Sequence, residues 1–497
     1  MKFLATLALF GTAVAEVFNQ PILWQDLADT DLIRVNDTYY YSASNMHFSP
    51  GAPILRSYDL VNWEYFSHSV PTLDFGDRFS LTNGNAYNWG IYASTIRYRS
   101  SNGLFYWIGC IQQTGKTYVY TSPSMEGPWT KASVISNVCY YDCGLLIDDD
   151  DRMYVAYGRW LADGANAVIW VAQLTKDGLQ HGSNQQIFHS NQSIGYVEGA
   201  RFYKRGGKYY VMLTNPGVGE GEIILKSSGG PMGPYDTWRQ MLKNNGNPVA
   251  GAGRPYQGAL VDTPKGDWHY IAFVNRFPGG RIPVLAPVTW DAQGWPNVNL
   301  PKGSWASSYD YPLPKRLVKP ITGTETFNGT KLGPQFEWNH NPDATKWSLG
   351  PGGLTLRTAT RTDDFRRYRT SPYFVEEKND IALSTIKQVQ MTDGVLMSSQ
   401  GGWRTTNKGT VVASQNLIGD ANANATVWLR CTTDISGNPG YATFQFSTDG
   451  ARFASLGRQH KMADGEIFFV GDRWGIFNFA TKNLGGNVVV KSFTISQ

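Results

Sequence analysis

The stretch CYYDCGLLIDDDDRMYVAYG, residues 139–158, combines a lone aspartate, an apolar run, an acidic turn and an aromatic strand. The run from Asp148 to Asp151 indicates a solvated turn, because like charges repel one another and favour water. Apolar and aromatic residues flank this turn on both sides, which is typical of two paired β-strands. Asp142 stands apart from the acidic run, ahead of the apolar residues, and is therefore a separate candidate for a functional residue.

The same pattern, a polar or glycine-containing turn followed by an aromatic-rich strand, occurs five times along the chain. Successive turns are 48 to 66 residues apart, which leaves room for about four short strands and their loops. Helical periodicity is nearly absent between the turns. The sequence therefore predicts an all-β fold in which residues 16–315 form a five-bladed β-propeller. The turns are centred on Asp37, Gly103, Asp151, Gly207 and Gly266, in the segments NDTYYYSAS, NGLFYWIGC, DDRMYVAYG, GGKYYVMLT and KGDWHYIAF.

The two ends of the chain differ from this repeated region. Residues 1–15, MKFLATLALFGTAVA, place Lys2 before a short apolar stretch and a small-residue A-x-A ending, which indicates a secretory signal peptide. Residues 316–324 form a basic, proline-containing linker, and residues 325–497 alternate short strands with glycine-rich turns, which predicts a β-sandwich. No later apolar run is long enough to span a bilayer. We therefore expect a secreted, extracellular protein that does not bind a membrane.

Charge and composition narrow the class of partner. The net charge of +4 is small for 497 residues and shows no lysine and arginine stripe, so nucleic acid is not an expected partner. Aromatic residues make up 14% of the chain, which suits a protein that stacks on sugar rings but equally suits a β-rich core. Four N-x-S/T sites, at Asn36, Asn191, Asn328 and Asn424, agree with passage through the secretory pathway and predict a glycoprotein.

The four cysteines, Cys110, Cys139, Cys143 and Cys431, can pair in an oxidising compartment, and four cysteines allow three connectivities. The sequence leaves open whether Cys139 pairs with Cys143, with Cys110 or with neither. The Cys139-x3-Cys143 spacing suggests a metal clip, but no second cysteine or histidine pair completes a zinc site. We therefore predict no metal ion.

The repeat also aligns three acidic residues. Counting back eight residues from Asp37 gives Asp29, and counting back nine from Asp151 and Gly207 gives Asp142 and Glu198. The first strand of each propeller blade lines the central channel, so these carboxyl groups should meet at the mouth of the axis. Three carboxyl groups suit acid–base cleavage of a glycosidic bond, because mutual repulsion keeps at least one of them protonated.

Alternatives exist for these assignments. Asp26 and Asp31 lie on either side of Asp29 and are rivals for its role, since an acid at a strand start is often only a turn former. The same count of nine gives Ser94 and Gln257 in the second and fifth units.

These segments resemble glycoside hydrolase family 43. The stretch DTDLIRVNDTYYYSAS is similar to the family's first-blade motif, whose leading aspartate, here Asp29, is the catalytic base. The stretch YYDCGLLIDDDDRMYVAYG is similar to the third-blade motif, whose aspartate, here Asp142, modulates the pKa of the acid and orients it. The stretch EGARFYKRGGKYYVM resembles the fourth-blade motif, whose glutamate, here Glu198, is the general acid.

Three further residues are predicted to bind substrate. The stretch GIYASTIRY resembles a motif that usually carries a tryptophan where this chain has Tyr92, a candidate sugar platform. The stretch PGGRIPVLAP resembles the segment whose arginine reaches the active centre, here Arg281. Trp24, which opens the segment WQDLADTDLIRV, is the third candidate. Many relatives carry a histidine near an axial calcium ion where this chain has Tyr256, so we predict neither a calcium ion nor another cofactor.

The resemblance implies inverting hydrolysis, in which Asp29 deprotonates the attacking water and Glu198 protonates the leaving oxygen. The segment GDWHYIAFVNRFPGGRIPVLAPVTWDAQGWP also resembles fungal arabinofuranosidases that act on arabinoxylan. We therefore expect a monomeric non-reducing-end α-L-arabinofuranosidase whose partner is a plant cell-wall polysaccharide, arabinoxylan or arabinan.

Other functions are compatible with the same sequence. A β-xylosidase or an arabinan-degrading exo-hydrolase would share the fold and the acids, because specificity lies in the loops around the pocket. A retaining, invertase-like enzyme also combines a propeller with a sandwich, but its NDPNG and RDP motifs are absent from this chain. A carbohydrate-binding propeller without activity belongs to another class, and the three carboxyl groups argue against it. The C-terminal region resembles a lectin-like sandwich, which either binds xylan or packs against the propeller.

Overall fold

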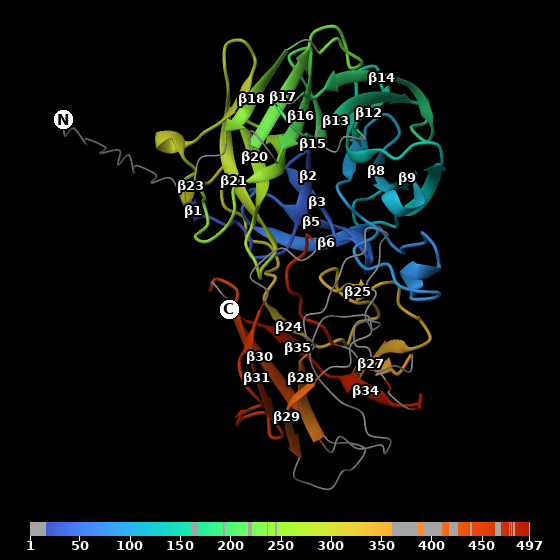
Figure 1. Cartoon of the computed structure of the whole chain (residues 1–497), viewed down its shortest axis with the longest axis vertical. Coiled ribbons are helices and arrows are strands. Elements are labelled where there is room, and N and C mark those ends of the chain that lie inside the picture. Colours follow the sequence, from blue (N-terminus) through green and yellow to red (C-terminus); the bar gives the residue numbers. More distant parts are fainter. Residues whose placement is uncertain are drawn as a thin grey trace, which may run out of the picture.

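The structure is a computed structural model, and the regular secondary structure of its described residues is almost entirely β-strand (Figure 1). These residues contain three short 3₁₀ helices, η1 (Asp77–Ser80), η2 (Gln112–Thr114) and η3 (Pro301–Gly303), none of which has the length to cross a membrane. The predicted signal peptide and the N-x-S/T site at Asn424 lie outside them. The described residues are 16–161, 167–191, 194–216, 221–235, 237–243, 246–359, 385–390, 410–416, 426–437, 440–462, 469–476, 478, 480 and 483–496.

Five four-stranded antiparallel sheets, here called sheets I to V, follow one another along the described N-terminal part of the chain. Each strand pairs with the next strand of its sheet, and each turn predicted from the sequence joins the first strand of a sheet to the second. Sheet I contains β2 (Ala28–Val35), β3 (Thr38–Ser44), β5 (Gly51–Ser57) and β6 (Trp63–Val70); sheet II contains β7 (Thr95–Arg99), β8 (Leu104–Ile111), β9 (Lys116–Ser122) and β10 (Thr130–Ile135); sheet III contains β11 (Tyr141–Ile147), β12 (Met153–Trp160), β13 (Ala167–Leu174) and β14 (His181–His189); sheet IV contains β15 (Glu198–Arg205), β16 (Lys208–Asn215), β17 (Gly221–Ser227) and β18 (Thr237–Lys243); sheet V contains β19 (Tyr256–Asp262), β20 (Trp268–Asn275), β21 (Arg281–Trp290) and β22 (Pro296–Val298).

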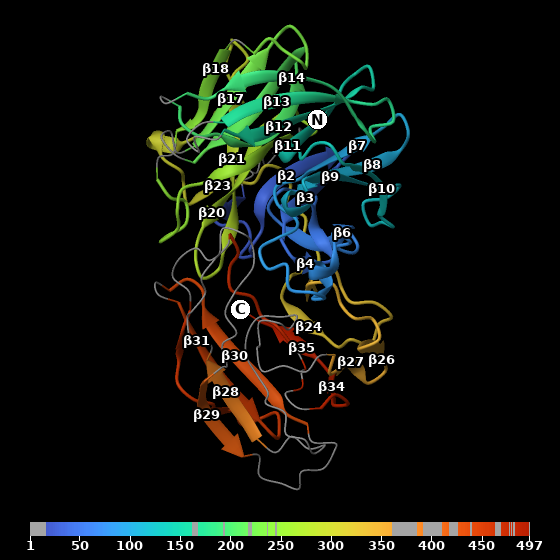
Figure 2. The ribbon, with the colours of Figure 1, turned by 45° about the vertical axis from the view of Figure 1, so that its right-hand side comes forward.

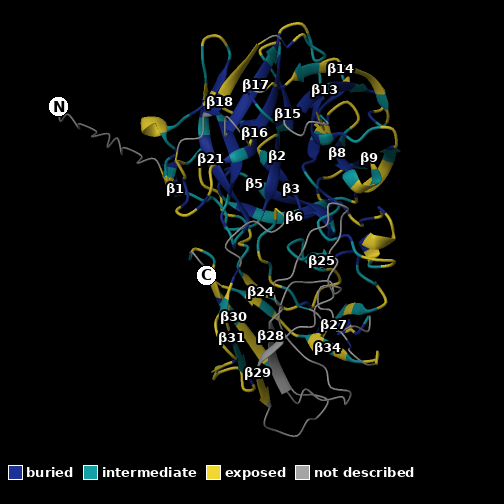
Figure 3. Cartoon of the chain, in the orientation of Figure 1, coloured by how far each residue is buried: buried dark blue, intermediate teal, exposed yellow. Residues whose placement is uncertain are grey.

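The first strands of these sheets pack against one another in a closed ring, in the order β2, β7, β11, β15, β19 and back to β2. Such a ring is the channel-lining layer of a β-propeller. The two ends of the propeller segment are joined, because β1 (Val17–Asn19) pairs with β23 (Ser308–Asp310). Most of these strands are buried, as the dark colour of Figure 3 shows. The prediction of an all-β fold with a propeller is therefore confirmed.

A fully buried arginine connects several of the first strands through their backbones. Arg201 on β15 donates hydrogen bonds of 2.7 to 2.9 Å to the carbonyl oxygens of Asp29 and Thr30 on β2 and of Cys143 on β11. The guanidinium thus joins sheets I, III and IV at the axis of the propeller.

Asp31 is the buried counter-charge of this arginine. Its carboxylate lies 3.8 Å from the Arg201 guanidinium and accepts hydrogen bonds of 2.7 to 2.9 Å from Thr95, the Ile96 backbone and Arg97 on β7. Asp31 and Arg201, neither of which is exposed, therefore form an axial hub that links sheets I to IV.

Four of the five first strands carry a register irregularity near the end where the chain enters the strand. The residues at these irregularities have left-handed backbone conformations: Asp29 (φ 58°), Asp142 (φ 48°), Gly199 (φ 67°) and Gln257 (φ 48°). Strand β7 pairs with β8 without such a shift. A β-bulge bends its strand and re-aims a side chain, so each bulge changes which residue faces the axis.

The predicted C-terminal β-sandwich is also confirmed, and it lies against one side of the propeller (Figure 2). Its described strands form small antiparallel sheets around two apolar clusters. The strands are β24 (Gly323–Glu325), which pairs with β35 (Phe493–Ile495); β26 (Trp347–Gly350), β27 (Gly353–Arg357) and β34 (Asn487–Val490); β28 (Thr385–Gln390) and β29 (Thr410–Asn416); and β30 (Trp428–Asp434), β31 (Tyr441–Ser447), β32 (Ala454–Ser455) and β33 (His460–Lys461).

Backbone pairing attaches this C-terminal region to the segment between β3 and β5 of sheet I. Strand β25 (Trp338–Asn339) pairs with β4 (Phe48–Ser49), and the His340 backbone donates a 3.0 Å hydrogen bond to the His47 carbonyl. The His340 ring accepts a 2.9 Å hydrogen bond from the Ala86 backbone. The C-terminal region is therefore part of one continuous hydrogen-bonded structure with the propeller.

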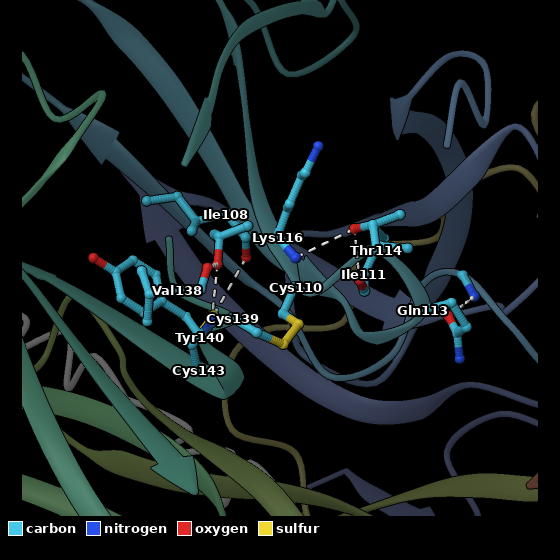
Figure 4. Close-up of a disulfide and its surroundings, with 12 residues drawn as sticks. Ile108, Cys110, Ile111, Gln113, Thr114, Lys116, Val138, Cys139, Tyr140 and Cys143 are labelled. Carbon is cyan, nitrogen blue, oxygen red and sulfur yellow. Dashed lines mark hydrogen bonds between the residues drawn. A yellow bond between two sulfur atoms is a disulfide. The ribbon is translucent and has the colours of Figure 1, made fainter. Parts of the chain in front are cut away.

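One disulfide, between Cys110 and Cys139, answers the pairing that the sequence left open (Figure 4). It joins the end region of β8 to the segment that enters β11, and so ties sheet II to sheet III. Cys143 is buried as a free thiol that donates to the Ile108 carbonyl at 3.5 Å, and Cys431 is also free.

The axial hub generates a stability prediction. We expect Arg201→Met to lower the free energy of unfolding by about 3 to 5 kcal/mol, because it removes the donor of buried carbonyl oxygens and the counter-charge of Asp31. Denaturant-induced unfolding measures the change. Arg152→Met is the matched control, since that side chain is 63% exposed, and it should change stability by no more than about 0.5 kcal/mol. Equal stability of the two variants would show that the axial hub does not stabilise the fold.

Candidate active site

The ring of first strands brings the three predicted carboxyl groups together. Asp29 lies on β2, Asp142 on β11 and Glu198 at the start of β15, all at the same end of their strands. Asp29 and Asp142 are each 5% exposed, and Glu198 is half-buried. Asp29 and Glu198 both act electrostatically on Asp142 and raise its pKa, so the three groups form one cluster.

The strand register corrects the predicted equivalence of the three acids. Gly199, not Glu198, occupies the bulge position of Asp29 and Asp142, and Glu198 precedes it, opposite Thr214. The count of nine residues suits a long turn such as the one between β11 and β12, whereas the turn between β15 and β16 has only two residues. Glu198 therefore projects from a regular strand position, which explains its greater exposure.

Both carboxylate oxygens of Asp29 have fixed partners. Arg281 forms an ion pair with one oxygen at 3.0 Å, and Ser44 donates to the other at 2.7 Å. The Arg281 guanidinium lies between the rings of Phe273 and Phe469, 4.6 Å from each centroid. Arg281 thus lies beside Asp29 and forms an ion pair with it.

The rivals of Asp29 have other partners. Asp31 belongs to the axial hub described above. Asp26 accepts a 2.9 Å hydrogen bond from the backbone of Arg281 and a 3.0 Å hydrogen bond from the backbone of Gly471. Asp26 therefore holds the backbone of Arg281, whereas Asp29 pairs with its guanidinium. Of the three aspartates, Asp29 is the one that lies in the carboxyl cluster and is paired with a cation.

Two tyrosines that the sequence analysis did not identify hold Glu198. Tyr196 donates to its Oε2 at 2.9 Å and Tyr141 at 3.3 Å, while the exposed Trp160 donates its indole N–H to the Tyr196 hydroxyl. Tyr141 belongs to a quoted motif and directly precedes Asp142, whereas Tyr196 lies just outside the next quoted motif, two residues before Glu198. Their closeness to the acids along the chain was the available signal.

Burial is the main cause that raises the pKa of Glu198, and repulsion from Asp29 adds to it. Hydrogen bonds from Tyr196 and Tyr141 and the charge of Arg281 act in the opposite direction. A buried acid with a raised pKa can keep its proton at a pH where an ordinary carboxyl group has lost it. Glu198 is therefore suited to act as a general acid.

Burial also raises the pKa of Asp142 well above its usual range, and repulsion from Glu198 and Asp29 adds to this effect. Arg201 and the backbone N–H of Gly199 favour its charged form. The sequence analysis treated Asp142 as the group whose charge raises the pKa of Glu198. In the structure, repulsion from Glu198 is one of the causes that raise the pKa of Asp142, and Asp29 is the acid whose repulsion raises the pKa of Glu198.

The two predicted aromatic candidates lie in different places. Burial, with repulsion from Asp29 and Asp142, raises the pKa of Tyr92 to about 12, which places Tyr92 beside the carboxyl cluster. Its hydroxyl donates to the Asn88 carbonyl. Trp24 is partly buried and packs against the apolar core.

The C-terminal sandwich contributes to the surroundings of Arg281, which the sequence analysis did not foresee. Phe469 covers one face of the guanidinium, and Gly471 binds Asp26. The buried Arg473 forms a 2.7 Å ion pair with Glu337 and lies 3.5 Å from Asp26. The segment 469–473 therefore packs against the site from the side of the sandwich.

The residue at the expected calcium position does not fit that ion. Tyr256 accepts a 2.9 Å hydrogen bond from Asn275 and packs on Phe273 with the ring centroids 4.6 Å apart. A neutral phenol engaged in this way is a poor replacement for a histidine ligand. Within the described residues, no group of three or more histidine, cysteine, aspartate and glutamate side chains is arranged to hold a metal ion.

Comparison with known proteins finds relatives over both parts of the chain. The family model described as Glycosyl hydrolases family 43 matches residues 18–296, and the model described as Beta xylosidase C-terminal Concanavalin A-like domain matches residues 324–376. The β-xylosidase of Formosa agariphila is 26% identical over 95% of this chain and 89% of its own length. The non-reducing end α-L-arabinofuranosidase BoGH43B of Bacteroides ovatus is 29% identical over 71% of this chain and 68% of its own length.

Solved structures have the same architecture. One is a family 43 glycoside hydrolase with an engineered active site, described as displaying both endo-xylanase and exo-arabinofuranosidase activity. It superposes with a TM-score of 0.86, is 39% identical in sequence, and the match covers 96% of this chain and 99% of that one.

The hydrogen bond from Tyr196 to Glu198 generates a pH prediction. This bond stabilises the charged carboxylate, so Tyr196→Phe should raise the pKa of Glu198 further. A general acid is active while protonated, and the basic limb of the pH profile of kcat/KM should therefore move up by roughly 0.5 to 1 pH unit. Tyr209→Phe is the matched control, because it removes a 2.7 Å tyrosine hydrogen bond to Asp148, outside the site. A basic limb that stays in place or moves down would contradict the assignment of Glu198.

The contact between Phe469 and Arg281 generates a prediction about the sandwich. Phe469→Ala should lower kcat/KM roughly two- to tenfold, because the guanidinium loses one of its two aromatic faces. Phe453→Ala is the matched control, since it removes a cation–π contact of 3.6 Å to Arg430 within the sandwich. Equal activity of the two variants would show that Phe469 does not support the site.

Proposed function

Since the chain belongs to glycoside hydrolase family 43, we propose that it is an inverting exo-hydrolase that releases α-L-arabinofuranosyl side chains from arabinoxylan. The observation that carries this proposal is that two acids of one cluster, Asp29 and Glu198, have different surroundings. Asp29 is paired with Arg281, and Glu198 is half-buried on Tyr196 and Tyr141. Asp29 has a cationic partner, whereas burial raises the pKa of Glu198 against its hydrogen bonds, and this difference suits a general base and a general acid.

In this mechanism Asp29 takes a proton from a water molecule, whose oxygen attacks the anomeric carbon. Glu198 gives its proton to the leaving oxygen as the glycosidic bond breaks. The configuration at the anomeric carbon is inverted, and the two carboxyl groups must leave room for the water, which corresponds to about 6.5 to 9.5 Å between them. Asp142 lies in the same cluster, where a second negative charge is disfavoured, and so helps to keep Glu198 protonated. The cleavage requires no cofactor.

Substrate specificity rests on the relatives. The solved structure described with exo-arabinofuranosidase activity and the Bacteroides ovatus arabinofuranosidase support arabinose release. The Formosa agariphila relative supports a β-xylosidase equally well, which makes release of xylose the second candidate function. An arabinan-degrading exo-hydrolase would use the same acids.

We also propose that the protein is secreted. The signal-like sequence of residues 1–15 supports this, as does the Cys110–Cys139 disulfide, since such bonds persist in oxidising compartments. Asn36, Asn191 and Asn328 are exposed and thus accessible to glycosylation. A polysaccharide substrate outside the cell is consistent with all of these features.

Incubation of the purified protein with soluble arabinoxylan tests the substrate, with the released monosaccharide identified by chromatography. Arabinose would support the main proposal, and xylose would shift it to the second candidate. Product analysis by proton NMR at early times distinguishes inversion from retention. Activity on none of arabinoxylan, arabinan and xylo-oligosaccharides would favour a carbohydrate-binding propeller without catalysis.

Variants of the acids test their separate roles. Asp29→Asn should lower kcat by about 10²- to 10⁴-fold on every substrate, because no other group activates the water. Glu198→Gln should lose a similar factor on arabinoxylan but far less on an aryl glycoside with a good leaving group, which needs no proton. Asp148→Asn, in the acidic run, is the control and should remain active. Equal losses of Glu198→Gln on both substrates would contradict its role as the acid.

A further inference from the structure

Gln257 occupies the place in sheet V that Asp29 and Asp142 occupy in sheets I and III. All three lie at a register irregularity of a first strand, have left-handed backbone conformations and are 5% exposed. A residue with a Cβ is disfavoured in this conformation, and such residues concentrate at functional sites. Two of the three are the candidate catalytic aspartates, which makes the third a candidate for the same centre.

The side chain of Gln257 lies against the strand that carries Glu198. A Cβ on Gly199 would be only 3.0 Å from Cγ of Gln257 and 3.4 Å from its Cδ. Gly199 directly follows Glu198, and its backbone N–H stabilises the Asp142 carboxylate. The carboxamide of Gln257 is therefore a near neighbour of two members of the carboxyl cluster.

A buried network holds Gln257 in its strained conformation. The Gln257 backbone donates a 2.8 Å hydrogen bond to the Thr214 hydroxyl, which itself donates to Glu222 at 2.6 Å. Tyr270 donates to the same Glu222 oxygen at 2.8 Å. Burial raises the pKa of Glu222 to about 7, against the effect of these hydrogen bonds and of the backbone N–H groups of Gln257 and Gly258. The buried carboxyl group of Glu222 therefore helps to hold the Gln257 backbone in place.

The carboxamide of Gln257 has no hydrogen-bond partner among the described residues, although only 5% of the residue is exposed. The corresponding residue of sheet II behaves differently, because the Ser94 hydroxyl accepts a 2.9 Å hydrogen bond from the Trp107 indole. Buried polar groups in native proteins are nearly always paired. A carboxamide offers both a donor and an acceptor, which matches the hydroxyl groups of a sugar.

We propose that Gln257 binds a hydroxyl group of the sugar residue whose glycosidic bond is cleaved. This inference rests on the proposed glycosidase function and adds a specificity-determining residue to it. Asp29, Glu198 and Gln257 would then approach the same sugar from sheets I, IV and V.

Gln257→Gly gives the sharpest test, because glycine adopts the left-handed conformation without strain. Its melting temperature should equal or exceed that of the wild type, while kcat/KM on an aryl pentoside that the wild type cleaves should fall roughly tenfold, the order expected for a lost hydrogen bond. The same comparison is made on each monodeoxy analogue of that glycoside. On the analogue that lacks the partner hydroxyl, wild type and variant should differ by less than about twofold, since the interaction is absent from both.

Thr214→Val is the contrasting variant, because it removes the support of Gln257 and leaves the carboxamide in place. It should lower the melting temperature and reduce activity by the same factor on every analogue. If Gln257→Gly also loses the same factor on every analogue, or loses no activity, Gln257 does not bind a sugar hydroxyl and the proposal is overturned.

Sugar binding is measured instead if the proposed glycosidase function fails. If the wild type cleaves no aryl pentoside, L-arabinose and D-xylose are titrated into wild type and Gln257→Gly by calorimetry. Binding that is roughly tenfold weaker in the variant supports the role of Gln257, by the same hydrogen-bond arithmetic. Binding of either sugar with equal affinity to both proteins, or of neither sugar to the wild type, overturns it.

Discussion

The active-site geometry depends on the buried contact between Arg201 and the first strands of the propeller. A guanidinium without exposed surface must satisfy its donors inside the protein, and Arg201 does so on the carbonyl oxygens of Asp29, Thr30 and Cys143. These bonds form only when β2, β11 and β15 converge on the axis. The arginine that closes the ring therefore also holds the backbone of Asp29 and of the residue that follows Asp142, and catalytic geometry and ring closure have one cause.

Strain at the site is a consequence of this arrangement. A left-handed conformation at Asp29, Asp142 and Gln257 is unfavourable locally, and it persists because the surrounding hydrogen bonds determine the strand path. Glu198 lies one position before the corresponding bulge and avoids the strain. The two environments differ accordingly: the three bulge residues are buried, whereas Glu198 is half-buried, where a leaving group can receive its proton.

The sequence predicted the propeller because hairpin turns and aromatic strands repeat locally, and it predicted Asp29 and Asp142 because the distance from turn to bulge is nearly constant. The count of nine residues reached Glu198, one residue before the bulge at Gly199, because a fixed count ignores the length of the turn. Asp26 and Asp31 could not be separated from Asp29 by pattern, since their roles depend on Gly471 and Arg97, which are distant from them in the sequence. Trp24 packs against the apolar core in the structure, and its predicted contact with substrate stays a prediction.

The contacts of the sandwich were beyond sequence reasoning for the same reason, and they decide how the two parts of the chain relate. Asp26 binds the backbones of Arg281 and Gly471 with its two oxygens, so one carboxylate joins the arginine that pairs with Asp29 to the sandwich. Phe469 then covers the guanidinium itself. A module that only tethered the propeller to its substrate would not need to contact Arg281, because tethering alone raises the local concentration of substrate. The sandwich is therefore built into the walls of the site, and the smallest unit that holds Arg281 against Asp29 in this way includes residues of both domains.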